Sequence, residues 1–213
     1  MEEEKKDGIS NKVFYLTILT IAVILSFAVY INFKEPRNSE RGGFVNQKQP
    51  GEAGSVEEMV GRKAPDFILE DISGKQVKLS DFSGKNVVLF FSEGAMCYPS
   101  CWNQIEQLAN DRNLNDDKTA SFSIVADSKE QWRKIIGRAP KFASANILFD
   151  TNRKVSSLYN VLNLPSSMHK GMYPGHTYII VDKGGIVRYA LDDPKMGIRN
   201  QIIFSELQKF GGA

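Results

Sequence analysis

A continuous apolar run, Val87–Phe91, is the feature of this chain that most restricts how it can fold. A strand with apolar residues on both faces needs a cover on each side, so it belongs in the middle of a sheet. Residues 92–94 end the run, and Pro99 is tolerated only near a helix start. Apolar side chains then recur at helical spacing, at Trp102, Ile105 and Leu108. The sequence predicts a central strand that leads through a short loop into a helix.

The two cysteines of the chain, Cys97 and Cys101, flank this junction. At a helix N-terminus, unpaired backbone N–H groups and the helix dipole stabilise a thiolate and lower the pKa of a cysteine. A thiol in this position is a nucleophile near neutral pH. The pattern therefore predicts thiol chemistry, and the alternative is a pair of small, inert core residues.

The spacing of Cys97 and Cys101 bears on how they react. Residues four apart on a helix have Cβ atoms about 5 to 6 Å apart, whereas a relaxed disulfide needs about 3.5 to 4.5 Å. A bond between the two is expected to distort the first helical turn. Strained, accessible disulfides are typical of catalytic or regulatory sites, because they are reduced easily.

The overall composition is that of a globular domain with an appendage. The chain has 213 residues, of which 42% are hydrophobic and 24% charged, and its net charge is +2. This charge is too small to indicate a nucleic acid as partner, and no dense patch of Lys and Arg interleaved with aromatic residues is present.

The N-terminal part of the chain contains one long apolar stretch. A polar tail, residues 1–12, precedes residues 13–33, which carry no charge and are long enough to span a bilayer as a transmembrane helix. The alternative is a cleaved signal peptide with its cleavage site at Ser26-Phe27-Ala28. Because the apolar run continues beyond Ala28, we expect an uncleaved signal anchor.

Residues 34–57 are rich in Pro, Gly, Asn, Gln and Ser and are interpreted as a flexible linker. Residues 58–213 then form the folded domain. The charges that flank the predicted span do not decide its orientation. We expect the domain outside the cytoplasm, on a single-pass cell-membrane anchor, since a short tail before a first span is commonly retained inside and a dithiol switch persists oxidised only outside.

Strands and helices alternate along the domain, which is the α/β pattern. A hairpin with its turn near Ser73-Gly74 precedes the central strand, and a second hairpin turns at residues 182–185. The other predicted elements are strands at 120–126 and 147–149, helices at 129–137 and 153–160, the strands 176–181 and 186–189 of the second hairpin, and an amphipathic helix at 198–210.

Residues 61–91, GRKAPDFILEDISGKQVKLSDFSGKNVVLFF, resemble the opening of the redoxin group. This group comprises the peroxiredoxins of the alkyl hydroperoxide reductase and thiol-specific antioxidant family and their thioredoxin-like disulfide reductase relatives. The shared features are the Ala-Pro-Asp-Phe start, the Gly-Lys turn, the Leu-Ser-Asp-Phe-x-Gly-Lys step and the apolar strand before the cysteines. The resemblance implies a thioredoxin-like fold with a central mixed β-sheet flanked by helices, and a thiol-dependent oxidoreductase.

The chain departs from both branches of this group at its site. Peroxiredoxins carry a threonine three residues before the reactive cysteine, where this chain has Gly94 or Tyr98, and an arginine on a later strand, where it has His176. Thioredoxin-like reductases use Cys-x-x-Cys and a cis-proline near that later position. Here three residues separate the cysteines, and Pro174 lies two residues before His176.

The Cys-x-x-x-Cys spacing with a distant histidine also resembles the copper-delivery proteins of cytochrome oxidase assembly. Soft thiolates with an imidazole suit copper, so this resemblance implies Cys97, Cys101 and His176 as ligands. Those proteins usually have a proline directly after the second cysteine, whereas this chain has Trp102.

Several other side chains near the site have a functional and a structural interpretation. His176 either acts beside the cysteines or is a partly buried, hydrogen-bonded histidine at a strand start. Met168 and Met172 are expected to be packing residues rather than soft metal ligands, and His169 a surface residue. Trp102 covers the cysteines or joins the core, and Trp132 packs its helix. Glu93 is expected to be an exposed loop carboxylate rather than a proton acceptor.

The hypothesis favoured by the sequence is a membrane-tethered oxidoreductase that exchanges thiols and disulfides with proteins or small molecules, with an antioxidant peroxide reductase as a variant. Cys97, nearer the loop, is expected to attack, Cys101 to resolve the mixed disulfide, and His176 to take and return the proton. No cofactor is needed. In the alternative hypothesis the protein is a copper-binding assembly factor.

Overall fold

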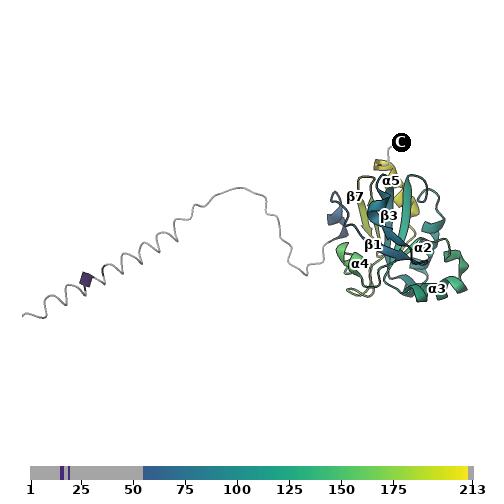
Figure 1. Cartoon of the computed structure of the whole chain (residues 1–213), viewed down its shortest axis with the longest axis horizontal. Helices are drawn as coiled ribbons and strands as arrows, with labels where there is room; N and C mark the ends of the chain where they lie inside the picture. Colours follow the sequence, from purple (N-terminus) through teal and green to yellow (C-terminus); the bar gives the residue numbers. More distant parts are fainter. Residues whose placement is uncertain (1–14, 17–18, 20–54, 211–213) are drawn as a thin grey trace, which may run out of the picture. The chain divides into compact units, whose positions relative to one another are not determined.

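The computed structural model describes residues 15–16, 19 and 55–210 (Figure 1). The predicted tail 1–12, nearly all of the predicted transmembrane helix 13–33 and most of the predicted linker 34–57 lie outside these residues. None of the helices among the described residues is long and apolar enough to cross a bilayer. The chain divides between Lys48 and Gln49, and the second unit, Gln49–Ala213, contains the fold described below.

A seven-stranded mixed sheet forms the centre of this unit, in the order β2-β1-β5-β4-β3-β6-β7. β3 is parallel to β4, which is parallel to β5, whereas β6 runs antiparallel to β3 on its other side. The strands are β1 (Ile68–Asp71), β2 (Gln76–Lys78), β3 (Asn86–Ser92), β4 (Thr119–Val125), β5 (Ile147–Phe149), β6 (Thr177–Val181) and β7 (Val187–Asp192).

β3 is the central strand that the apolar run predicts. All seven of its residues are buried, and their side chains alternate between two hydrophobic clusters. Leu89 contributes to a cluster shared with the short helices η1 (Val56–Met59) and α4 (Lys154–Leu158). Phe90 contributes to the cluster shared with the longer helices α2 (Ser100–Asn110), α3 (Lys129–Arg138) and α5 (Asn200–Phe210).

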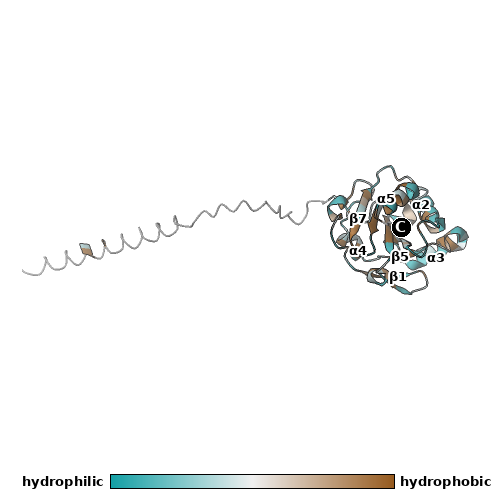
Figure 2. Ribbon diagram, turned by 90° about the horizontal axis from the view of Figure 1, so that it is seen from above, coloured by the Kyte–Doolittle hydropathy of each residue, from teal (hydrophilic) through white to brown (hydrophobic). Residues whose placement is uncertain are grey.

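The sheet therefore separates two helical layers, which Figure 2 shows from above with α4 on one side and α2, α3 and α5 on the other. This unit also contains three further short 3₁₀ helices, η2 (Leu79–Phe82), η3 (Gly94–Met96) and η4 (Pro140–Phe142). Val56, which the sequence analysis placed in the linker, is fully buried in the core.

The predicted α/β order is confirmed, with shifts at the ends of elements. The helix expected at 153–160 is the shorter α4, because Arg153 and Asn160 have φ values of 61° and 55°, which do not fit a right-handed helix. The closing helix begins at Asn200, and the strand expected from His176 begins one residue later, at Thr177. Both hairpins form as expected, with β1 paired to β2 and β6 to β7.

Shortening a buried side chain of the central strand β3 should lower the stability of the protein. We expect Leu89→Ala to lower the free energy of unfolding by about 2–5 kcal/mol, because Leu89 is fully buried and its removal leaves a cavity. Ile68→Ala is the control, since Ile68 is 56% exposed on β1 and should change stability by less than about 1 kcal/mol. Urea denaturation measures both, and equal effects would contradict the assignment of β3 as the core strand.

Candidate functional site

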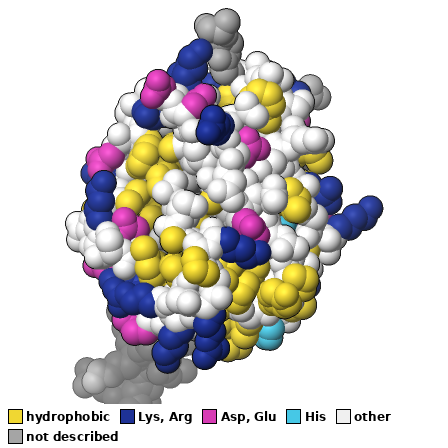
Figure 3. All heavy atoms as spheres, turned by 90° about the vertical axis from the view of Figure 1, so that its right-hand side faces the viewer, with side chains coloured by type: hydrophobic (Ala, Val, Ile, Leu, Met, Phe, Trp, Pro, Cys, Tyr) yellow, Lys and Arg dark blue, Asp and Glu magenta, His cyan; other side chains and the backbone are white. Residues whose placement is uncertain are grey.

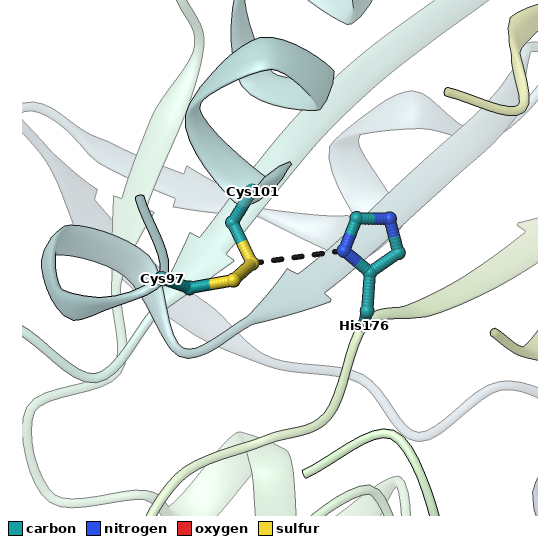
Figure 4. A group of neighbouring side chains, drawn as sticks. All are labelled: Cys97, Cys101 and His176. Atoms are coloured by element: carbon teal, nitrogen blue, oxygen red, sulfur yellow. Dashed lines mark hydrogen bonds between the residues drawn. A yellow bond between two sulfur atoms is a disulfide. The ribbon is translucent and has the colours of Figure 1, made fainter. Parts of the chain in front are cut away.

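Cys97, Cys101 and His176 come together at the carboxyl end of β3 (Figure 4). The two cysteines form a disulfide, and the Nδ1 atom of His176 lies 3.6 Å from Sγ of Cys101. All three residues are buried, with exposed fractions of 3%, 1% and 1%. The sequence analysis singled out these three residues, and the structure places them in one cluster.

The chain between β3 and α2 is a turn stabilised by its own backbone. The N–H of Cys97 donates to the carbonyl of Gly94, and the N–H of Cys101 donates to the carbonyl of Cys97. Only Cys101 lies within α2, whereas Cys97 follows η3 and precedes the helix. The expected distortion of the first helical turn is therefore not needed, and the Cα atoms stand 5.3 Å apart. The expected accessibility is also wrong, because both cysteines are buried, whereas Met96 and Tyr98, the neighbours of Cys97 in the sequence, are exposed.

Sheet register explains how residue 176 meets residue 101. β6 runs antiparallel to β3, with Thr177 opposite Phe91, so the residue just before β6 lies beside the end of β3. The chain enters α2 from that same end. His176 is thus brought to the cysteines by strand pairing, over 75 residues of sequence separation.

The hydrogen bonds of His176 define its tautomer. Its Nε2 atom lies 3.2 Å from the carbonyl oxygen of Gly197 and 2.9 Å from the Tyr178 hydroxyl. Because a carbonyl can only accept, Nε2 carries the hydrogen, and the lone pair of Nδ1 faces the Cys101 sulfur. The Phe90 ring packs on the imidazole with a centroid separation of 4.7 Å. Burial lowers the pKa of His176 to about 4, against the opposing effect of the Gly197 carbonyl, so the imidazole is neutral at pH 7.

Asp127 holds the turn that carries Cys97, and the sequence analysis missed it. One carboxylate oxygen, Oδ2, accepts from the Ala95 N–H at 2.8 Å and from the Trp132 indole N–H at 2.9 Å. The Trp102 indole N–H donates to the Ala95 carbonyl, so both polar groups of Ala95 are bonded. Burial raises the pKa of the Asp127 carboxyl, and the two hydrogen bonds oppose this. Its position soon after the buried strand β4, parallel to β3, is the signal that could have identified it.

Gly94 is required by this arrangement. Its φ is +65°, and a Cβ atom added to it would lie 2.0 Å from Oδ2 of Asp127. A side chain at residue 94 would displace the carboxylate that holds Ala95. Gly94 therefore serves the packing of the turn, and it occupies one of the two positions counted for the peroxiredoxin threonine.

Glu93 is buried, which corrects the expectation of an exposed loop carboxylate. It is 1% exposed, and its Oε1 atom accepts from the backbone N–H groups of Met168 and His169 and from the Ser167 hydroxyl. Its Oε2 atom lies 3.1 Å from Nδ1 of His169. Glu93 therefore joins the end of β3 to the turn at residues 167–169.

The remaining expectations have mixed outcomes. Met168 and Met172 are 60% and 57% exposed, so their assignment as packing residues is wrong. His169 is a surface residue, as expected. Trp132 is fully buried, which confirms its packing role, and Trp102 packs on the same cluster as Trp132.

A model of the AhpC/TSA family matches residues 60–190. Thiol-disulfide oxidoreductase ResA of Bacillus subtilis is 32% identical over 130 residues, which cover 60% of this chain and 65% of ResA. Peroxiredoxin Bcp of Escherichia coli is 29% identical over 149 residues, which cover 68% of this chain and 93% of Bcp.

Solved structures show the fold. The reduced 2-Cys peroxiredoxin of Plasmodium vivax superposes with a TM-score of 0.61 at 21% identity, covering 72% of this chain and 96% of that one. A putative protein disulfide isomerase from Bacteroides thetaiotaomicron gives 0.54 at 18% identity, covering 71% and 87%. The predicted fold class, an α/β thioredoxin-like fold with a mixed sheet flanked by helices, is confirmed.

The pKa of His176 predicts how the stability of the oxidised protein depends on pH. Between about pH 4 and 6.5 the unfolded chain binds a proton at this residue that the folded chain does not, so stability falls as pH falls through this window. This one group should make the protein about 2 kcal/mol less stable at pH 5 than at pH 7.

The measurement is urea unfolding of the oxidised protein at both pH values, compared with His176→Asn. The variant should lack this component and keep the contribution of the carboxylates. An identical pH dependence in the two proteins would show that His176 is not buried as a neutral imidazole.

Proposed function

Because the chain belongs to the AhpC/TSA family and is a thiol-dependent oxidoreductase, we propose that it exchanges thiols and disulfides through Cys97 and Cys101 while anchored to a membrane. One observation carries this proposal: the two cysteines form a disulfide beside the unprotonated nitrogen of a buried histidine. The proposed substrates are protein or small-molecule disulfides and thiols.

The positions of the two sulfur atoms support different roles. Cys97 lies in the turn before α2, between the exposed residues Met96 and Tyr98, so a partner reaches it first. The helix N-terminus stabilises a thiolate there. Cys101 lies inside α2 against His176, which suits the thiol that resolves a mixed disulfide.

In the proposed reaction, the Cys97 thiolate attacks one sulfur of a substrate disulfide, and the other substrate sulfur leaves as a thiolate. The Cys101 sulfur then attacks Sγ of Cys97, which forms the intramolecular disulfide and releases the second substrate thiolate. Two electrons pass from the cysteine pair to the substrate. A substrate dithiol drives the same steps in reverse.

His176 acts on Cys101 in this scheme. After reduction, the Nδ1 lone pair can accept the hydrogen of the Cys101 thiol. The imidazole is a weak base while the disulfide is present, because burial lowers its pKa. A thiolate at Cys101 would place a negative charge beside the ring and raise that pKa, since an opposite charge favours the imidazolium. Proton uptake by the ring is thereby linked to reduction.

The residues at the peroxiredoxin positions favour disulfides over peroxides as substrates. A peroxide site needs hydroxyl and guanidinium donors near the reactive sulfur. The counted positions hold Gly94, which has no side chain, Tyr98, which is 72% exposed, and His176, which is a neutral imidazole. Peroxide reduction is the alternative reaction, and the rates with peroxide and disulfide substrates should be compared on the same protein.

The location belongs to the proposal as well. Residues 13–33 are apolar and uncharged over a length that spans a bilayer, and residues 34–57 supply a linker. We place the domain outside the cytoplasm, where an oxidised cysteine pair persists.

The cysteine roles can be tested by single substitutions. Cys97→Ser should abolish turnover of a disulfide substrate, because no thiolate is left to attack. Cys101→Ser should react once and accumulate a mixed disulfide at Cys97, which intact-mass spectrometry detects. Ser100→Ala is the matched control for a local change at the start of α2 and should keep turnover. Full multi-turnover activity of Cys101→Ser would contradict the resolving role.

Copper delivery is a second candidate function, favoured by the positions of the three ligand atoms. The two sulfur atoms and a ring nitrogen of Cys97, Cys101 and His176 lie within 4.8 Å of one another. Reduction would turn them into two thiolates and an imidazole, a donor set that suits copper(I). Copper would be the cargo in this case.

This candidate predicts that the reduced chain binds one more copper(I) than the oxidised chain under a competing chelator. The difference should disappear in Cys97→Ser and in His176→Asn. A reduced protein with no additional copper(I) would rule out copper delivery and leave disulfide exchange in place.

A further inference from the structure

The turn at residues 168–172 presents three potential ligands to solvent. Met168 and Met172 are 60% and 57% exposed, although methionine usually packs in a core. The side chain of His169, between them, is 45% exposed. Hydrophobic side chains do reach the surface elsewhere, between lysines and arginines (Figure 3). Two largely exposed methionines on the same turn as an exposed histidine nevertheless form a chemically distinct group.

Hydrogen bonds give this turn a defined backbone. The N–H groups of Met168 and His169 donate to Oε1 of Glu93, at 2.6 and 2.9 Å. The N–H groups of Met172 and Tyr173 both donate to the carbonyl of His169. The chain thus closes one tight turn between the two methionines. Their exposure is a property of an ordered turn.

Glu93 also fixes the tautomer of His169. Nδ1 of the ring lies 3.1 Å from Oε2 of Glu93, and a carboxylate can only accept, so Nδ1 carries the hydrogen. The lone pair is then on Nε2. A carboxylate bonded to the other ring nitrogen is the arrangement that orients metal-binding histidines and increases their basicity. The 1% exposure of Glu93 shows that this carboxylate lies beneath the turn.

We propose that Met168, His169 and Met172 bind one copper(I) ion through two thioether sulfurs and Nε2 of the imidazole. Thioethers are soft, uncharged ligands that favour copper(I) over zinc or magnesium. The buried negative charge of Glu93 compensates the charge of the ion through the imidazole. The site is separate from Cys97, Cys101 and His176, does not depend on their redox state, and goes beyond the proposed thiol exchange.

The test uses the full chain with Cys97→Ser and Cys101→Ser, which removes both thiolates. Titration with copper(I), without oxygen and against a competing chelator of known affinity, should give one ion per chain. Adding Met168→Leu and Met172→Leu should weaken binding at least about tenfold, and Glu93→Gln should weaken it about 10- to 100-fold. Met96→Leu, which changes another exposed methionine, is the control and should bind as before.

A second measurement guards against unfolding of the variants. The oxidised wild-type chain, titrated with silver(I) as a redox-inert probe, should also bind one ion, and His169→Asn should abolish this. Absence of binding in both the serine variant and the oxidised chain would overturn the proposal, as would unchanged affinity after the two leucine substitutions. The thiol-exchange assays above are independent of either result.

Discussion

Burial of β3 on both faces is the constraint on which the rest of the structure depends. Its side chains must alternate between two hydrophobic clusters, so a helical layer has to cover each side of the sheet. The polar backbone of the strand is satisfied only by neighbours on both edges, β4 in parallel and β6 in antiparallel orientation. The turn that carries Cys97 and Cys101 follows directly from the carboxyl end of this strand.

The same pairing accounts for the residues that surround the disulfide. An antiparallel neighbour begins where β3 ends, which brings His176 to the site, and a parallel neighbour ends at the same edge, which brings Asp127. One residue contacts the sulfur of Cys101, and the other holds the backbone of Ala95. The residue beside the sulfur and the residue that holds the turn thus precede or follow the two strands that flank β3.

The sequence was sufficient for the order of elements and for the cysteine–histidine cluster. A strand that is apolar on both faces must lie inside a sheet, and the alternation of strands with helices indicates the α/β fold class. The cysteines stand next to that run, so their place followed from it. His176 was found through the family resemblance, which places it where peroxiredoxins carry an arginine, although which cysteine it contacts depends on strand register, which no local pattern contains.

Long-range hydrogen bonds explain what could not be predicted. Glu93 looks like a loop residue because its partners, residues 167–169, lie about 75 positions away. Asp127 likewise acts on Ala95, 32 residues earlier. Met168 and Met172 were assigned to packing because methionine usually packs in a core, whereas the structure shows both exposed on a hydrogen-bonded turn. Local sequence patterns therefore predict strands and helices, but they do not predict hydrogen bonds between residues that are far apart in the sequence.

The depth of the disulfide has a consequence for selectivity. With exposed fractions of 3% and 1%, Cys97 and Cys101 are scarcely accessible to molecules in solution while the turn keeps this conformation. A reactant can approach either sulfur only if the turn that carries Cys97 shifts, and the hydrogen bonds of Ala95 resist this shift. For any of the proposed thiols and disulfides, the rate of reaction should therefore depend on how readily the turn opens, and not on reducing power alone.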